Sequence, residues 1–114
     1  MLNSTDDFVS RLNGVTLPDN YSFVSFDVES LFTNVPLQEA IDLACHYVYS
    51  VHTTTCPNFD RKHFKKLLEY ATSSEFLYND KLYRQVDGVA MGSPLGPTLA
   101  NLFLAHLEQD WTKV

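Results

Sequence analysis

The sequence has few positive charges, few cysteines and no long apolar run. Eight Lys and Arg residues stand against fourteen Asp and Glu residues, so the net charge is -6. A negative net charge disfavours binding of nucleic-acid phosphates over a broad surface. Two cysteines are too few for a disulfide framework and indicate a reducing, intracellular compartment. No apolar run approaches the roughly 18 residues of a membrane span, so we expect no membrane partner.

The composition nevertheless predicts a folded chain. Hydrophobic residues make up 45% of the sequence and aromatic residues 13%, which excludes wholesale disorder. With 114 residues, the chain corresponds to one small domain or to a piece of a larger one, and it can bury only a modest core.

One carboxylate lies at the end of an apolar segment. Residues 21–28 favour a strand through Tyr21, Phe23, Val24, Phe26 and Val28. Asp27 falls within this segment, and a strand aspartate is costly to bury unless it is paired or bound to a metal. We therefore predict a cation there, and the carbonyl of Val28 offers a hard oxygen ligand that suits magnesium. Glu29 would lie on the same face only if the strand continued, whereas we expect a turn there.

Capping residues and apolar spacing predict the other elements. Helices are expected over residues 4–13 with Ser4 or Thr5 as N-cap, over 36–50, after Asp60, and from Pro97 onward. Asn79-Asp80 predicts a β-hairpin, because both residues tolerate the positive φ of a two-residue turn. The predicted fold class is α+β, with the 21–28 strand and the hairpin forming a small antiparallel sheet packed on helices.

A second candidate segment, Gly88–Pro97, combines three glycines with two prolines before a helix. Glycine lets the backbone approach a ligand closely, and a helix N-terminus offers free N–H groups. Alone this loop is weak evidence, because many helices are entered in this way.

Residues 26–36 (Phe-Asp-Val-Glu-Ser-Leu-Phe-Thr-Asn-Val-Pro) and Gly88–Pro97, followed by Ala-Asn-Leu-Phe at 100–103, resemble the first and second palm motifs of reverse transcriptases. The Penelope-like retroelement group is the most similar. The resemblance includes residues 3–8 and the hairpin, so it covers nearly all of residues 1–114. It implies the first half of a right-hand polymerase palm. The implied enzyme is an RNA-directed DNA polymerase that uses an RNA or DNA template-primer, deoxynucleoside triphosphates and Mg²⁺.

The resemblance also implies roles for individual residues. Asp27 would be a catalytic metal ligand, Val28 would supply its carbonyl, and Phe32 would reject the 2'-hydroxyl of a ribonucleotide by steric clash. The loop that contacts the template and the incoming nucleotide would contain Met91, Gly92 and Ser93. The alternatives are that Phe32 is a core residue and that Gly92 is a turn glycine.

The sequence departs from the family pattern in two respects. The family completes its metal site with two adjacent aspartates after the second motif, but the only adjacent pair here is Asp6-Asp7. Most of the fingers and the thumb are also missing, so we expect an inactive fragment that holds Mg²⁺ weakly or not at all. The alternative is a non-enzymatic, truncated or repurposed scaffold that binds a partner chain or self-associates. A small magnesium-dependent nuclease would need more clustered carboxylates.

Three weaker signals remain. The cations Arg61, Lys62, Lys65 and Lys66 are typical of a solvated helix face. Lys65, Lys66, Lys81 and Arg84 are candidates for a nucleic-acid path, with Tyr78 and Tyr83 as stacking surfaces. The alternative, which is more common for a hairpin with alternating tyrosines, is an ordinary sheet face. The histidines and cysteines, such as His52, Cys56 and His63, do not have the spacing of a zinc site.

Overall fold

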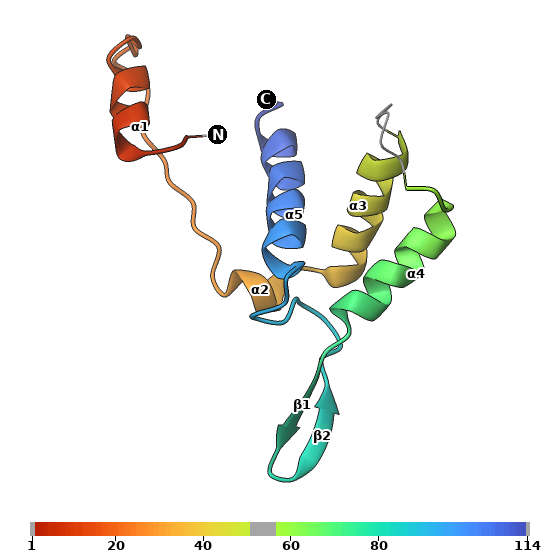
Figure 1. Cartoon of the computed structure of the whole chain (residues 1–114). Helices are drawn as coiled ribbons and strands as arrows, with labels where there is room; N and C mark the ends of the chain where they lie inside the picture. Colours follow the sequence, from red (N-terminus) through yellow and green to blue (C-terminus); the bar gives the residue numbers. More distant parts are fainter. Residues whose placement is uncertain (1, 51–56, 114) are drawn as a thin grey trace.

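Three helices pack together at the centre of the molecule. The computed structural model describes residues 2–50 and 57–113. In chain order the elements are α1 (Thr5–Leu12), α2 (Leu31–Asn34), α3 (Leu37–Ser50), α4 (Arg61–Thr72), β1 (Glu75–Tyr78), β2 (Lys81–Arg84) and α5 (Gly96–Trp111). Helix α3 packs against both α4 and α5 (Figure 1). Within the described ranges, no helix is long and apolar enough to cross a membrane.

Local capping and turn chemistry places the element boundaries as the sequence predicts. The Ser4 hydroxyl accepts a hydrogen bond from the Asp7 N–H at 3.1 Å and caps α1. The Asp60 carboxylate accepts from the His63 N–H at 3.0 Å and caps α4. Asn79 and Asp80 both have positive φ, 49° and 59°, and they join β1 to β2. The predicted helices and the predicted hairpin are thereby confirmed.

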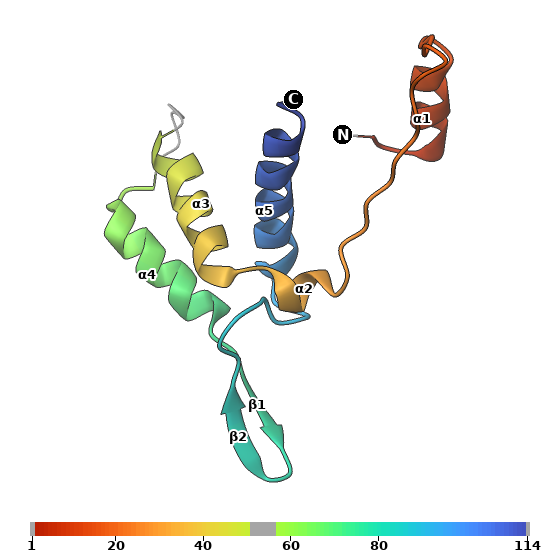
Figure 2. The ribbon, with the colours of Figure 1, turned by 180° about the vertical axis from the view of Figure 1, so that it is seen from behind.

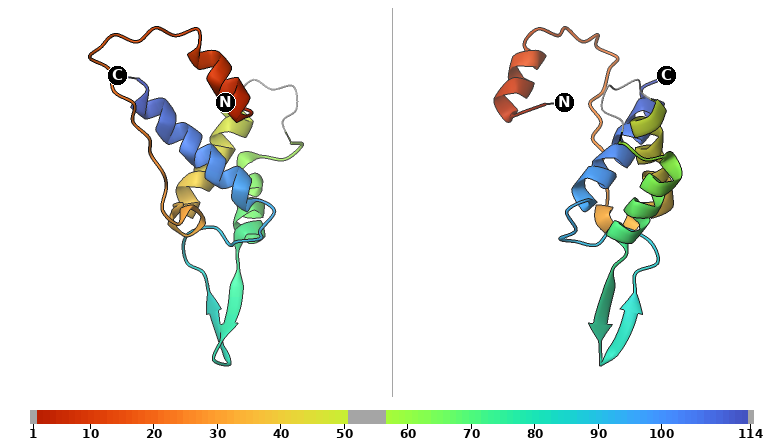
Figure 3. Two further views of the ribbon diagram at one scale, coloured as in Figure 1. Left: turned by 90° about the vertical axis from the view of Figure 1, so that its left-hand side faces the viewer. Right: turned by 45° about the vertical axis from the view of Figure 1, so that its right-hand side comes forward.

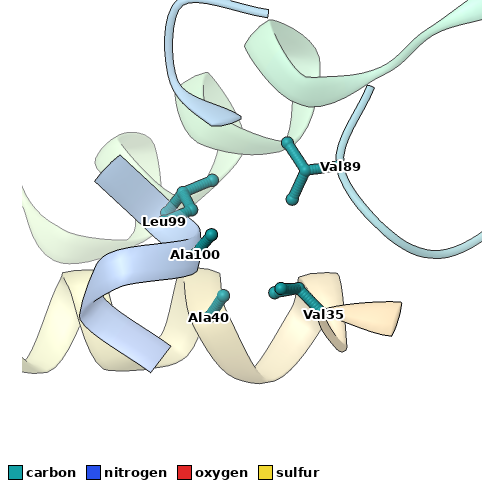
Figure 4. Packing of buried hydrophobic residues seen from close by; sticks show 5 residues of the cluster. All are labelled: Val35, Ala40, Val89, Leu99 and Ala100. Atoms are coloured by element: carbon teal, nitrogen blue, oxygen red, sulfur yellow. The ribbon is translucent and has the colours of Figure 1, made fainter. Parts of the chain in front are cut away.

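The core consists of two small clusters that meet at α3. The first joins α3 and α5 to the segments before them and contains Val35, Ala40, Val89, Leu99 and Ala100 (Figure 4). The second lies between α3 and α4 and contains Ile41, Cys45 and Leu68. Burial raises the pKa of the Cys45 thiol above its ordinary value. Both clusters depend on α3, which therefore organises the fold.

The predicted strand over residues 21–28 is wrong. This segment belongs to no strand, and the one sheet among the described residues contains only β1 and β2. Its apolar side chains are largely exposed, Phe23 by 78% and Phe26 by 81%. A strand requires a neighbour to complete its backbone hydrogen bonds, and no described segment pairs with this one. Asp27 therefore lies on a non-helical, unpaired segment and not at a strand end.

The hairpin also differs from the expectation of a sheet packed on helices. It projects from one end of the helical group (Figures 1 and 2), and every residue of both strands is exposed. Helix α1 likewise contains no buried residue. The Cα radius of gyration is 18.6 Å, whereas a compact chain of about 100 residues has one of about 13 Å. The fold is thus α+β at a coarse level, but open in shape.

Candidate functional site

The two sequence motifs touch each other through their backbones. The Val89 N–H donates a hydrogen bond to the Phe32 carbonyl at 2.5 Å. Gly88, with a φ of +76°, lies so close that an added Cβ would be 2.6 Å from the Thr33 carbonyl oxygen. Glycine is therefore required at position 88 by both its backbone conformation and its surroundings. This contact holds the start of the 88–97 loop against α2.

Phe32 and Met91 line the same small hollow. Its volume is about 130 Å³, and its lining also includes Ser30, Leu31 and Thr33. Phe32 is half-buried, and it packs against the first core cluster while it lines the hollow. Met91 is exposed at the rim. The two alternatives for Phe32, core residue and site residue, are therefore compatible.

A tight turn holds Phe32 in place. Ser30 has a left-handed φ of 49°, and the Thr33 hydroxyl donates a hydrogen bond to the Ser30 carbonyl at 3.0 Å. The Asn34 side-chain amide donates to the Glu29 carbonyl at 2.9 Å. The expected turn at Glu29 is confirmed. Because Glu29 lies in a turn, it does not extend the segment that carries Asp27.

Asp27 and Val28 line a second, larger groove against α5. The groove has a volume of about 310 Å³, and the remaining lining residues are Phe26, Leu31, Leu104, Leu107, Glu108 and Trp111. Leu31 borders both hollows, so the two adjoin each other. Glu108 adds a second carboxylate that the sequence reasoning did not single out. Among the described residues, no group of three or more His, Cys, Asp and Glu side chains is arranged to hold a metal.

Gly92 and Ser93 follow Met91 in the loop before α5. Gly92 is exposed and has a φ of +86°, so it also fits the alternative of a turn glycine. The Ser93 hydroxyl oxygen is buried without a hydrogen-bond partner, whereas its backbone N–H donates to the Ala90 carbonyl at 3.1 Å. Buried hydroxyls normally have partners. The Ser93 hydroxyl is therefore an unpaired polar group enclosed by the loop before α5.

Asp87 is, after Glu108, a second residue at this site that the sequence did not single out. Its Oδ1 accepts hydrogen bonds from the Leu37 N–H at 3.0 Å and from the Gly88 N–H at 2.8 Å. These two bonds, that of Leu37 first, hold the pKa of Asp87 below its ordinary value. One carboxylate thus caps α3 and fixes the start of the 88–97 loop. The signal in the sequence was indirect: α3 follows Val35-Pro36, and neither residue offers a capping side chain.

We predict that Asp87→Asn lowers the melting temperature at neutral pH. The native pKa is depressed, so the ionised carboxylate stabilises the fold above the ordinary aspartate pKa of about 3.9. That stabilisation is lost as the pH falls through the native pKa. Thermal unfolding followed by circular dichroism should therefore show a gap between wild type and variant at pH 7 that closes in strong acid.

The exposed Asp19 provides the matched control for this prediction. Asp19→Asn should leave the melting temperature unchanged across the same pH range. If Asp87→Asn and Asp19→Asn behave alike at neutral pH, the carboxylate of Asp87 does not fasten the loop.

The basic cluster of α4 is partly used in the fold. The Lys65 ammonium contacts the Asp42 carboxylate at 2.7 Å, which links α4 to α3 and raises the pKa of Lys65. Arg61, Lys62 and Lys66 are exposed, as expected of a solvated face. Of the zinc candidates, His63 contacts the Asp60 carboxylate through its ring, while His52 and Cys56 lie outside the described residues.

The structure thus places the predicted site residues around two adjoining hollows. Asp27 and Val28 border the larger one, Phe32 and Met91 border the smaller one, and Gly92 and Ser93 continue the loop beyond Met91. Comparisons with protein-family models, with curated proteins and with solved structures give no significant match.

Proposed function

We propose that this chain carries the first two palm motifs of a reverse transcriptase from a retroelement. The observation that supports the proposal best is the direct contact between the motifs, made by the Val89–Phe32 hydrogen bond and by the packing of Gly88 on Thr33. These segments are far apart in the sequence, yet they meet beside the core cluster that they share through Val35 and Val89. A nucleotide site built from both segments would require this contact.

In this proposal each hollow has a separate task. Phe32 and Met91 border the space where the sugar and base of an incoming nucleotide would lie, and the half-buried ring of Phe32 would exclude a 2'-hydroxyl. Asp27, which is exposed to solvent, would offer its carboxylate to Mg²⁺, a cation that prefers oxygen ligands. Bound Mg²⁺ would stabilise the charge that develops on the phosphoryl oxygens during transfer.

The residues present fit only part of such a metal site. Two-metal phosphoryl transfer uses several carboxylates, and the only adjacent aspartate pair, Asp6-Asp7, belongs to α1, which contains no buried residue. Glu108 borders the same groove as Asp27, but two carboxylates are a sparse set. We therefore predict that the 114-residue chain has no template-dependent polymerase activity by itself.

Primer extension tests this prediction. The purified chain, a labelled primer on an RNA or DNA template, deoxynucleoside triphosphates and Mg²⁺ should give no extended product. Template-dependent extension by this chain would contradict the prediction. A longer chain that supplies a strand with an Asp-Asp pair should extend the primer, and Asp27→Asn should abolish that extension. An active Asp27→Asn variant would contradict the assignment of Asp27.

The second candidate is a palm-like scaffold without catalytic activity that binds a partner chain. It is favoured by the exposed apolar side chains of Phe23, Phe26 and Trp111, the last two of which contact each other with ring centroids 5.8 Å apart. A chain with such a surface should self-associate when no other partner covers it. Size-exclusion chromatography at several concentrations checks this, and a clean monomer throughout would argue against the scaffold.

A further inference from the structure

The β-hairpin has two chemically different faces, and both are open to solvent. In its register, Phe76 lies opposite Tyr83 and Tyr78 lies opposite Lys81. Side chains alternate between the faces of a strand, so one face carries Phe76, Tyr78, Lys81 and Tyr83, which we call the aromatic face. The other face carries Glu75, Leu77, Leu82 and Arg84. All eight residues are exposed.

The rings of the aromatic face form a continuous row. Phe76 and Tyr83 are nearly parallel, with centroids 5.6 Å apart and an angle of 16° between the rings. Tyr83 also contacts Tyr78, at 6.5 Å and with the rings inclined at 60°. Tyr78 remains 64% exposed despite this contact. The row is thus held in place by contacts within the hairpin, while part of each ring surface remains accessible.

Charge is distributed unequally between the two faces. Lys81 is the only charged strand residue on the aromatic face, and the nearest acid in sequence, Asp80, belongs to the turn. On the opposite face Arg84 contacts Glu75 at 3.2 Å, so its charge is compensated within the hairpin. A row of rings with one cation and no strand carboxylate is suited to a ligand that has flat rings and negative charge.

Single-stranded nucleic acid has both of these properties. Unpaired bases stack on aromatic side chains in a sequence-tolerant way, and a nearby cation attracts the phosphates. A duplex hides the faces of its bases and would have to bind through phosphates alone, which a chain of net charge -6 disfavours. A protein partner would instead be expected to use the aliphatic face with Leu77 and Leu82. The aromatic face therefore favours an unpaired strand.

The position of the hairpin leaves this face accessible. Figure 3 shows from two further sides that the hairpin projects beyond the helices and that no other described element lies beside it. A flexible strand can therefore reach the rings without any rearrangement of the fold.

We propose that the aromatic face of the hairpin binds single-stranded nucleic acid, with unpaired bases stacked on Phe76, Tyr78 and Tyr83 and with Lys81 beside a phosphate. The proposal deepens the proposed function, because it names a contact for an unpaired template strand away from the two hollows. It requires neither a metal nor catalysis. It can therefore be tested on the present chain, independently of any polymerase activity.

Fluorescence anisotropy tests the proposal. The probe is a labelled oligothymidylate of about 12 nucleotides, a length within the usual site sizes of single-strand binding proteins. The wild-type chain should bind this strand more tightly than a blunt duplex of equal length, and the affinity should fall with added salt. Tyr78→Leu should weaken binding roughly 5- to 150-fold. Tyr78→Trp, which keeps a stacking surface, should retain it.

The neighbouring Leu77 is the matched control, because it is even more exposed, at 74%, and lies on the opposite face. Leu77→Ala should leave the affinity unchanged. Lys81→Glu keeps all three rings, and it should weaken binding and reduce its salt dependence. Circular dichroism of each variant checks that the fold is retained.

Two results would overturn the proposal. One is the absence of any binding by the wild-type chain, even at low salt. The other is an equal loss of binding in the Leu77→Ala and Tyr78→Leu variants. If the chain then also self-associates in a way that depends on Leu77, the hairpin is a protein interface. If the oligonucleotide binds as expected but the completed enzyme does not extend a primer, the proposed polymerase function fails while this binding site stands.

Discussion

Gly88→Ala is expected to destabilise the chain more than any other single change in its loops. The added Cβ would lie 2.6 Å from the Thr33 carbonyl oxygen and 2.9 Å from that of Phe32, and both are backbone atoms that cannot turn aside. The φ of +76° adds a left-handed strain of about 1–2 kcal/mol for a residue with a side chain. Overpacking typically adds about 1–3 kcal/mol. We therefore expect a loss of roughly 2–5 kcal/mol in the free energy of unfolding, a large part of the stability of a small domain.

Gly92 provides a close control for this prediction. Its φ is +86°, but an added Cβ would meet no atom within 4 Å. Gly92→Ala should therefore cost only the backbone strain, about 1–2 kcal/mol. Urea unfolding measures the free energy of unfolding of each variant. The difference between the two values gives the contribution of the close contact between Gly88 and the Phe32–Thr33 backbone. Equal stabilities would show that the two motifs are not packed together as described.

The elements that the sequence predicted correctly are those with a local physical cause. Ser4 and Asp60 cap the helices that follow them within three residues, and Asn79-Asp80 closes a hairpin between adjacent strands. In each case the side chain and its partner are close in sequence. Such features form wherever the local geometry allows them, so the pattern of residue types was sufficient.

The strand over residues 21–28 was predicted wrongly because strand formation is not local. The β-branched and aromatic residues of this segment fit a pleated sheet, but a strand also requires backbone partners from elsewhere in the chain. The described residues supply none, so the segment lies unpaired and exposed. The residue preferences therefore indicated that the segment can form a strand, but not whether a partner strand is present in this structure.

Asp87 is a second case in which a long-range contact could not be predicted from the local sequence. Its side chain caps Leu37, a residue 50 positions earlier, and no local pattern marks a cap at such a distance. The contact of Gly88 with Thr33 is also long-range, although the glycine itself was visible in the sequence. The sequence thus identified most residues of the candidate site, while the bonds that bring them together became visible only in the fold.

The prediction with the largest expected effect on function concerns Phe32. In a chain completed to an active polymerase, Phe32→Val should increase the use of ribonucleotides relative to deoxynucleotides, because the smaller side chain leaves room for a 2'-hydroxyl in the hollow. Apolar pockets discriminate against an added hydroxyl by about 100-fold at most. We therefore expect the ratio of kcat/KM for the two nucleotides to change by up to about that factor. Single-nucleotide incorporation kinetics measure this ratio.

A loss of stability in Phe32→Val could imitate a loss of selectivity, so Phe103→Val serves as a control for stability. Both phenylalanines are half-buried and pack against the same core cluster, but Phe103 does not line the hollow. Phe32→Val and Phe103→Val should therefore both lower the melting temperature, since each removes apolar contacts from one core. Only Phe32→Val should alter the choice between the sugars. If both variants keep the discrimination of the parent enzyme, Phe32 is a core residue alone, and the hollow beside Met91 does not hold the sugar.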